Sequence, residues 1–290
     1  MERCDEQVDV KGVLCMLASV VLFAANTLLI RAASDFSVAA DGWMALLFRG
    51  VLGVFLLHAI YRKSGILDWK RVFTNRFVFM RGLIGGVAII SFYITIVELG
   101  AARASVINLT YPMFATLIAA FWLKEKVSMV KRVWLVVALA GLVVFLSDGK
   151  SSLTPSMYDL LGLLGAVSSG WVVVIVRRLR DDMHPAQIYA ALVVFSLLMG
   201  VPSLVKVAEL SDFSWGFLGA AAIVVTFGQL YMTSAYQHLS IVQGSSLQMA
   251  LPVVTAFGAF VFFGESFQAY ELAGALVSLF AIWRVAAGKK

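Results

Sequence analysis

The chain consists of long apolar runs that are separated by short polar stretches. A helix needs about 20 apolar residues to cross the hydrocarbon core of a bilayer. Segments of about this length follow one another through the sequence: 11–30, 43–60, 77–97, 103–123, 131–147, 158–176, 185–205, 213–235, 241–263 and 268–287. The pattern therefore predicts an all-α integral membrane protein with ten transmembrane helices and short loops.

Lysine and arginine residues are concentrated in every second polar stretch. If the N-terminus lies in the cytoplasm, 17 of these residues fall on the cytoplasmic side and 4 on the outer side. Lysine and arginine favour the cytoplasmic side of membrane proteins. An odd number of spans would remove this alternation, so the charges support an even count and predict that both termini are cytoplasmic.

The composition excludes a soluble globular protein. Hydrophobic residues make up 61% of the 290 residues and charged residues only 14%, whereas a soluble domain is about half apolar and a quarter charged. The basic stretches between spans explain the net charge of +6, so we expect the lipid bilayer as a partner and no nucleic acid. Cys4 and Cys15 both lie near the N-terminus and provide no disulfide framework.

The two halves of the chain share an internal repeat with an offset of 140 residues. Its equivalent positions are Leu99 and Leu239, Ser105 and Ser245, Pro112 and Pro252, and Glu125 and Glu265. The repeat divides the chain into two five-span units, 1–150 and 151–290, and an odd number of spans makes the two copies opposite in topology. Such inverted repeats are typical of secondary transporters, whose sites lie near the bilayer midplane. An old duplication with no role in transport is the alternative.

Pro112 and Pro252 are each expected to kink a span and to serve as a hinge. Proline lacks an amide hydrogen and frees the carbonyl group four residues earlier, here that of Asn108 and that of Gln248. Both of these residues also carry side-chain amides, which need partners inside a bilayer. They either line a polar cavity and bind substrate or join neighbouring helices.

Together these features resemble the EamA type of the drug/metabolite transporter superfamily. Besides the ten spans and the two copies, the resemblance rests on an ending that both copies share. This ending reads Ser105…Tyr111-Pro112…Leu123-Lys124-Glu125 in the first copy and Ser245…Leu251-Pro252…Phe263-Gly264-Glu265 in the second. Phe48-Arg49 is similar to the family's arginine in the second span. The resemblance implies a ten-helix bundle around a central cavity, with the fifth and tenth spans at the periphery as a homodimer contact.

Arg49 is the one charge that we expect deep within a span, roughly 9 Å from its start at 1.5 Å per residue. It can bind a substrate carboxylate, pair with Glu98 at the outer end of the third span to close a gate, or extend its charged end to the interface. The resemblance favours a gate or a structural role, because the family has this arginine whatever its substrate. Glu125 and Glu265 follow spans and are expected to be structural or gating residues.

Polar and aromatic side chains within the spans complete the predicted site. An amide in lipid needs a partner, so Asn26 and Gln229 are stronger candidates than the aromatic residues, which also serve packing and interfacial roles. The predicted substrate-binding residues are Asn26, Arg49, Tyr93, Asn108, Tyr111, Trp171, Gln229 and Gln248. They match a mostly apolar pocket with a few orienting polar groups.

The sequence predicts a secondary transporter in the plasma (inner) membrane that works by alternating access. Arg49 and the amides suit an amino acid or a related zwitterion, with export favoured. Uptake or exchange of S-adenosylmethionine is the alternative, because Phe48-Arg49-Gly50 and Arg81-Gly82-Leu83 are also similar to that branch of the family.

Two further classes are weighed against transport. A membrane-embedded enzyme is a distant alternative, since the chain lacks His-Glu-x-x-His, Gly-x-Ser-x-Gly and metal-ligand spacings. We therefore expect no catalytic residue, metal or cofactor. A scaffold or sensor that no longer transports is separated from a transporter only by an assay.

Overall fold

The computed structural model describes residues 10–122, 129–146, 155–179, 182–239, 247–248, 250–265 and 267–287. The regular elements of these residues are helical. In chain order they are α1 (Val10–Phe36), α2 (Gly42–Tyr61), α3 (Arg71–Thr74), α4 (Arg76–Leu99), α5 (Ala101–Asn108), α6 (Tyr111–Trp122), α7 (Met129–Leu146), α8 (Met157–Leu179), α9 (Pro185–Gly200), the 3-10 helix η1 (Val201–Glu209), α10 (Asp212–His238), α12 (Leu251–Phe263) and α13 (Ala269–Ala287).

Six helical segments of the described chain are long and apolar enough to cross a membrane. They are α1, α2, α4, α8, α9 continued by η1, and α10. The all-helical class and its apolar spans are thus confirmed. The count of ten spans and the inversion of the two halves stay predictions.

The expected fourth span, 103–123, is not one continuous helix. α5 ends at Asn108, a turn follows at Leu109 and Thr110, and α6 begins at Tyr111. Pro112 therefore lies in the first turn of a new helix, where its missing amide hydrogen leaves no helical bond unmade. The expectation of a kink within one helix is wrong at this position, because the helix is interrupted before the proline.

Pro252 has the same position in the second half, as the second residue of α12. The backbone amide of Ala250, two residues earlier, donates to the carbonyl of Leu247 at 3.1 Å, which is a tight turn rather than a continuing helix. The beginning of the expected span 241–263 lies outside the described residues. A hinge role for either proline stays a prediction.

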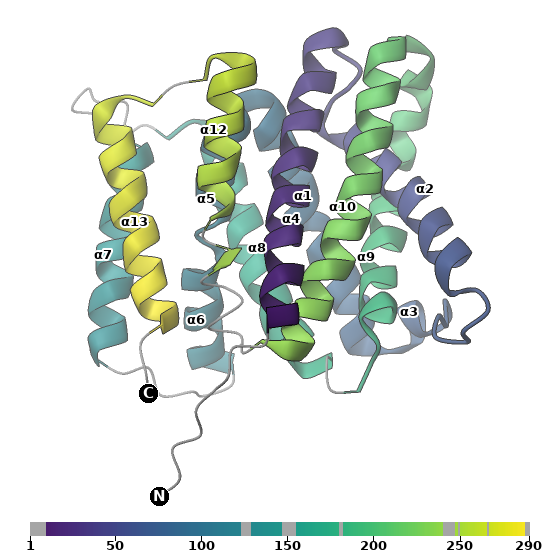
Figure 1. The fold of residues 1–290 in the computed structure, drawn as a ribbon, viewed down its shortest axis with the longest axis horizontal. Coiled ribbons are helices and arrows are strands. Elements are labelled where there is room, and N and C mark those ends of the chain that lie inside the picture. Colours follow the sequence, from purple (N-terminus) through teal and green to yellow (C-terminus); the bar gives the residue numbers. More distant parts are fainter. Residues whose placement is uncertain are drawn as a thin grey trace, which may run out of the picture.

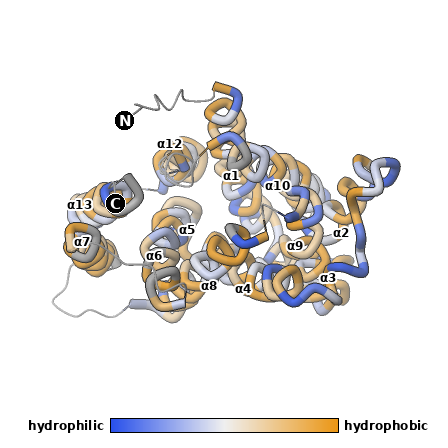
Figure 2. The backbone as a smooth tube through the Cα atoms, turned by 90° about the horizontal axis from the view of Figure 1, so that it is seen from below, coloured by the Kyte–Doolittle hydropathy of each residue, from blue (hydrophilic) through white to orange (hydrophobic). Residues whose placement is uncertain are grey.

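Helices that are far apart in the sequence lie side by side in the bundle (Figure 1). α1 packs against α10, α4 against α8, and α2 against α9. α7 and α13 pack against each other at one edge of the bundle (Figures 1 and 2). This is the peripheral position that the family resemblance implies for the fifth and tenth spans, while a dimer contact through them is still a prediction.

α2 and α9 approach each other closely at two glycines. A Cβ atom on Gly200 would lie 2.6 Å from the Cα atom of Leu47, and a Cβ atom on Gly50 would overlap the backbone of Leu197. Small residues allow membrane helices to pack backbone against backbone. The two glycines therefore hold Arg49, the neighbour of Gly50, at a defined depth against α9.

Candidate functional site

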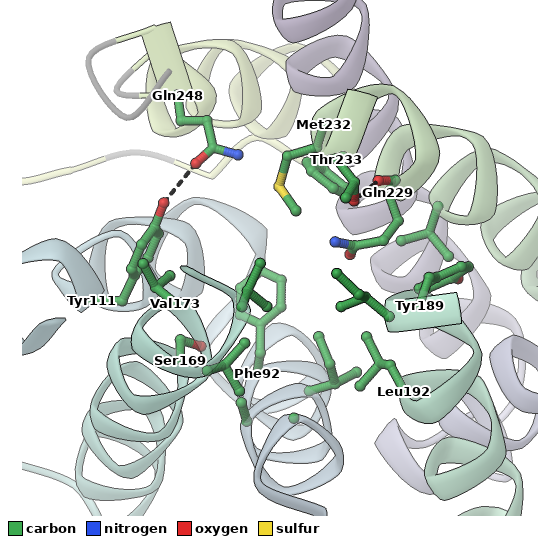
Figure 3. Close-up of a pocket in the computed structure, with 18 of the residues that line it drawn as sticks. Phe92, Tyr111, Ser169, Val173, Tyr189, Leu192, Gln229, Met232, Thr233 and Gln248 are labelled. Atoms are coloured by element: carbon green, nitrogen blue, oxygen red, sulfur yellow. Dashed lines mark hydrogen bonds between the residues drawn. The ribbon is translucent and has the colours of Figure 1, made fainter. Parts of the chain in front are cut away.

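A cavity of about 790 Å³ lies in the centre of the bundle. Its walls come from α1, α2, α4, α8, α9, α10, the turn between α5 and α6 and the start of α12, and Figure 3 shows part of its lining. It extends from Asn26 and Arg49, near the middle of α1 and α2, to Met183 and His238, where α9 begins and α10 ends. Its volume is that of a small-molecule site.

The structure brings most of the predicted binding residues together. The cavity is lined by Asn26, Arg49, Tyr93, Asn108, Tyr111, Gln229 and Gln248. Trp171 is not part of this lining, and its ring lies 5.2 Å from the ring of Trp122. An indole is large and mostly apolar, so it packs well between helices. Whether the seven residues bind substrate stays a prediction.

Arg49 is the centre of a hydrogen-bonded group at one end of the cavity. Its Nη1 atom donates to the Tyr93 hydroxyl at 2.9 Å, and its Nη2 atom donates to the side-chain oxygen of Gln229 at 3.5 Å. The Tyr93 hydroxyl in turn donates to the side-chain oxygen of Asn26 at 3.5 Å. The guanidinium carbon also lies 5.7 Å from the ring centre of Tyr189. Four helices, α1, α2, α4 and α10, thereby contribute hydrogen-bonding groups to one buried network.

Among the residues that the structure describes, this network has no acidic member. Arg49 is 2% exposed, and its Nε atom has no hydrogen-bond partner in the structure. The side chain of Glu98 is exposed near the end of α4, about one and a half turns beyond Tyr93. Arg49 and Glu98 thus lie in different environments in this conformation, and a gate formed by their pairing stays a prediction.

Arg81 is a second buried arginine in the cavity wall, and sequence reasoning missed it. It is 4% exposed and lines the same cavity as Arg49. Arg81 enters the sequence-based prediction only through the motif Arg81-Gly82-Leu83, while Arg49 is expected to be the one deep charge. The available signal was its depth, since Arg81 is the sixth residue of α4. Tyr189, which is 1% exposed, is likewise a cavity residue that was not predicted.

The two interrupted helices meet at the other side of the cavity. The hydroxyl group of Tyr111 donates to the side-chain oxygen of Gln248 at 2.6 Å, and both side chains face the cavity (Figure 3). Tyr111 begins α6, and Gln248 lies just before α12. The residues around the two prolines thus build one wall from both halves of the chain.

Glu265 lies outside the cavity and links the halves at the opposite end of the bundle. Its carboxylate accepts hydrogen bonds from the backbone amides of Ala101 and Ala102, both at 3.0 Å, at the N-terminus of α5. The Nε atom of Arg31 lies 3.5 Å from the same carboxylate. A carboxylate at a helix N-terminus is stabilised by the free amides and the helix dipole. Glu125, the equivalent residue of the first half, lies outside the described residues.

His184 precedes α9 near the end of the bundle where Met183 and Pro185 line the cavity. Its Nδ1 atom accepts a hydrogen bond from the backbone amide of Ala186 at 3.2 Å and so caps the helix. Partial burial lowers the pKa of His184 because it disfavours the charged imidazolium. The neutral form, which can accept the hydrogen bond, is thereby favoured.

Comparison with known proteins identifies the family. A sequence model of the EamA-like transporter family matches residues 10–147 and, a second time, residues 156–286. The chain belongs to the EamA-like transporter family. The resemblance to the drug/metabolite transporter superfamily, read from the motifs, is confirmed.

Individual relatives extend over most of the chain. The pseudopaline exporter CntI of Pseudomonas aeruginosa is 26% identical over 284 residues, which cover 96% of this chain and 97% of that protein. The human solute carrier family 35 member G1 is 24% identical over 78% of this chain and 65% of its own length. A crystal structure of a protein that is 17% identical has the same fold, with a TM-score of 0.59 over 95% of this chain and 96% of that one.

Proposed function

We propose that this EamA-like transporter is a secondary transporter of the plasma (inner) membrane that moves a small polar metabolite by alternating access. The observation that carries the proposal is the cavity, whose polar lining comes from both halves of the chain. Arg49 and Tyr93 belong to the first half and Gln229 to the second, and they share one hydrogen-bonded network. A site between two repeats is where such transporters bind substrate.

The packing of the helices supports two equivalent halves. In the predicted repeat, α1 corresponds to α8 and α4 corresponds to α10. Exchange of the halves converts the contact of α1 with α10 into the contact of α8 with α4, and both contacts exist. α2 and α9, which are also equivalent, pack against each other, as do α7 and α13. This pattern is what a pseudo-twofold axis between inverted repeats produces.

Ion pairs join the two halves at the end of the bundle away from the cavity. Arg103 of α5 pairs with Asp159 of α8 and with Glu271 near the start of α13, both at 2.9 Å. Arg31 and Glu265 form a further contact between the halves. With the orientation that the basic loops predict, these pairs lie on the outer side and the cavity extends toward the cytoplasm, as in an inward-facing state.

An amino acid or a related zwitterion is the substrate class that we favour. A guanidinium group binds a carboxylate with two parallel hydrogen bonds, and the surrounding amides and hydroxyls orient the rest of the molecule. Export is favoured because the relative in Pseudomonas aeruginosa is an exporter of pseudopaline. S-adenosylmethionine is the alternative, but its sulfonium group would have to lie near Arg49 and Arg81.

Thermal stabilisation of the purified protein tests the substrate class. A ligand that binds the folded state raises the melting temperature by mass action, so we would screen amino acids, S-adenosylmethionine, sugars and nucleotides. We expect stabilisation by amino acids, followed by flux of the same compound in proteoliposomes. Stabilisation by S-adenosylmethionine alone would reverse the ranking of substrates. Chemical conversion of a bound compound without its movement across the membrane would contradict the proposed transport function.

A further inference from the structure

The cavity has an excess of positive charge. Arg49 and Arg81 both line it, and its described lining includes no aspartate or glutamate. With 2% and 4% exposure, both side chains are almost completely removed from solvent. Burial of a charge without a partner is costly. A bound molecule that brings negative charge would remove this cost, so the charge points to the nature of the ligand.

The direction of the Arg81 side chain argues against a role at the interface. Side chains on a helix normally lean toward its N-terminus, and for Arg81 that is also the nearer end of α4. An arginine that extends to the interface would follow this direction. The Nη1 atom of Arg81 instead lies against Gly85, one turn further into α4, and Gly85 is itself part of the cavity wall. The guanidinium group is therefore directed into the cavity and away from the nearer end of the helix.

The hydrogen-bonding groups of the two arginines differ in how well they are satisfied. Arg49 donates to Tyr93 and to Gln229 and keeps only its Nε atom without a partner. The Nε and Nη1 atoms of Arg81 are both buried and have no hydrogen-bond partner in the part of the chain that the structure describes. Buried donors are nearly always satisfied by protein, water or ligand. Arg81 therefore has more donor atoms free to bind a molecule in the cavity than Arg49 has.

We propose that the cavity binds a substrate with two anionic groups, and that Arg81 is the residue that binds the second one. The substrate class is a small dicarboxylate, or an amino-acid derivative with an additional carboxylate, whose acidic groups contact Arg49 and Arg81. This inference rests on the proposed transport function and narrows its substrate from a zwitterion with one carboxylate to a molecule with two.

The stability of the ligand-free protein gives a test that needs no substrate. Arg81→Gln removes a buried charge that has no acidic partner, so we expect the melting temperature of the empty protein to stay constant or rise. Arg62→Gln removes the same charge from an exposed position at the end of α2 and is the matched control. A melting temperature that falls in Arg81→Gln but not in Arg62→Gln would show a structural arginine and overturn the proposal.

Ligand binding tests the two anionic groups directly. Succinate, L-aspartate and citrate are the probes with two or three carboxylates, and L-alanine and L-lysine are the controls with one carboxylate. We expect the acidic probes to raise the melting temperature at millimolar concentration. Their affinity should fall about tenfold or more in Arg81→Gln, because the loss of one hydrogen bond to a charged group changes a binding constant by about that factor. Affinity should be unchanged in Arg62→Gln.

The outcomes separate this inference from the proposed function. Stabilisation and flux of L-alanine without any effect of the acidic probes would overturn the inference and leave the transporter standing. The inference would also be contradicted if none of the acidic probes raised the melting temperature. Failure of every probe to cross proteoliposomes, despite stabilisation by succinate or citrate that Arg81→Gln abolishes, would support the anion site and contradict transport of these probes.

A second variant separates the position of Arg81 from its charge. A Cβ atom on Gly85 would overlap the Nη1 atom of Arg81 and would lie 2.9 Å from the Cδ1 atom of Leu192. Both atoms are flexible side-chain ends, so Gly85→Ala should fold but displace the guanidinium group. We expect it to weaken binding of the acidic probes without loss of charge. Gly216→Ala, which meets no atom within 4 Å, is its control, and equal binding by the two variants would contradict the assigned position.

Discussion

Arg103 and Asp159 form an ion pair with two contacts, Nε to Oδ1 at 2.9 Å and Nη2 to Oδ2 at 3.2 Å. The pair connects α5 with α8, and the Asp159 side chain is only 4% exposed. The same carboxylate accepts hydrogen bonds from the amide and hydroxyl groups of Ser156, at 3.0 and 2.9 Å. Asp159 is therefore a buried charge whose described opposite charge is Arg103.

Loss of this opposite charge should destabilise the protein strongly. Arg103→Gln leaves Asp159 buried without a cation, and we expect the free energy of unfolding to fall by about 3 kcal/mol. Lys206→Gln is the control, because Lys206 pairs with Asp41 at 3.3 Å on the surface, with about half of its side chain exposed, and should cost less than about 1 kcal/mol. Denaturant unfolding in detergent measures both. Equal losses would mean that the buried pair contributes no more than a surface pair.

Glu265 should control the opening of the end of the bundle that Arg103 helps to join. Glu265→Gln keeps the shape of the side chain but weakens its bonds to the amides of Ala101 and Ala102 and removes the charge opposite Arg31. A loss of about 1 kcal/mol, which is typical of a helix cap, changes the ratio of two conformations roughly fivefold.

Cysteine labelling measures this change. In a background without Cys4 and Cys15, a cysteine in place of the buried Ala102 should react with a maleimide several times faster when Glu265→Gln is present. Glu209→Gln removes an exposed carboxylate at the end of η1 and should leave the rate unchanged. An unchanged rate in Glu265→Gln would assign Glu265 a purely structural role.

The sequence predicted the polar lining of the cavity better than its buried charges. Asn26 and Gln229 were predicted because an amide cannot face lipid, and this constraint alone directs both into the interior. Arg81 was missed because its position in the sequence does not give the direction of its side chain, which turns away from the nearer end of α4 and lies against Gly85. Trp171 lies outside the described cavity lining and against Trp122, because an indole fits a packed helix interface as well as a cavity wall.

The break before Pro112 shows a second limit. Proline chemistry predicts a disturbed helix, but either a kink or a full interruption accommodates the absence of the proline amide hydrogen. The choice depends on packing between distant segments, here the contact of Tyr111 with Gln248. Apolar periodicity and charge therefore predicted the helices and their class, while tertiary contacts decided where a span is interrupted.

The stability of the protein should depend on the protonation of His184. Its pKa is lowered in the folded state, so in mildly acidic solution the unfolded chain binds the proton more readily than the folded one. The contribution is therefore fully present above the ordinary pKa of histidine, about 6.5, and is lost as the pH falls below it. Protonation also removes the acceptor that caps α9 and places positive charge at a helix N-terminus.

His184→Asn is the variant that isolates this effect. Asparagine caps helices well but does not titrate, so the variant should keep its stability at pH 7 and lose less of it on acidification to pH 5. Melting temperatures at the two pH values give the comparison, and His58→Asn, at an exposed histidine near the end of α2, is the control. An equal pH dependence in the wild type and in His184→Asn would exclude His184 as its source.

Gly50 should be intolerant of any side chain because it sets the distance between α2 and α9. A Cβ atom there would overlap the backbone of Leu197, and backbone atoms cannot move aside as a flexible side chain does. Gly50→Ala must therefore separate the helices, displacing the adjacent Arg49 from the hydroxyl of Tyr93. We expect a loss of about 2 kcal/mol in stability, in the range for overpacked interiors, and impaired binding of any substrate carboxylate.

Gly216→Ala, at an exposed position of α10 with no atom within 4 Å, should instead stabilise the helix by up to about 1 kcal/mol. If Gly50→Ala binds substrate normally at unchanged stability, then α2 and α9 are free to separate, and the depth of Arg49 is set by its hydrogen bonds alone.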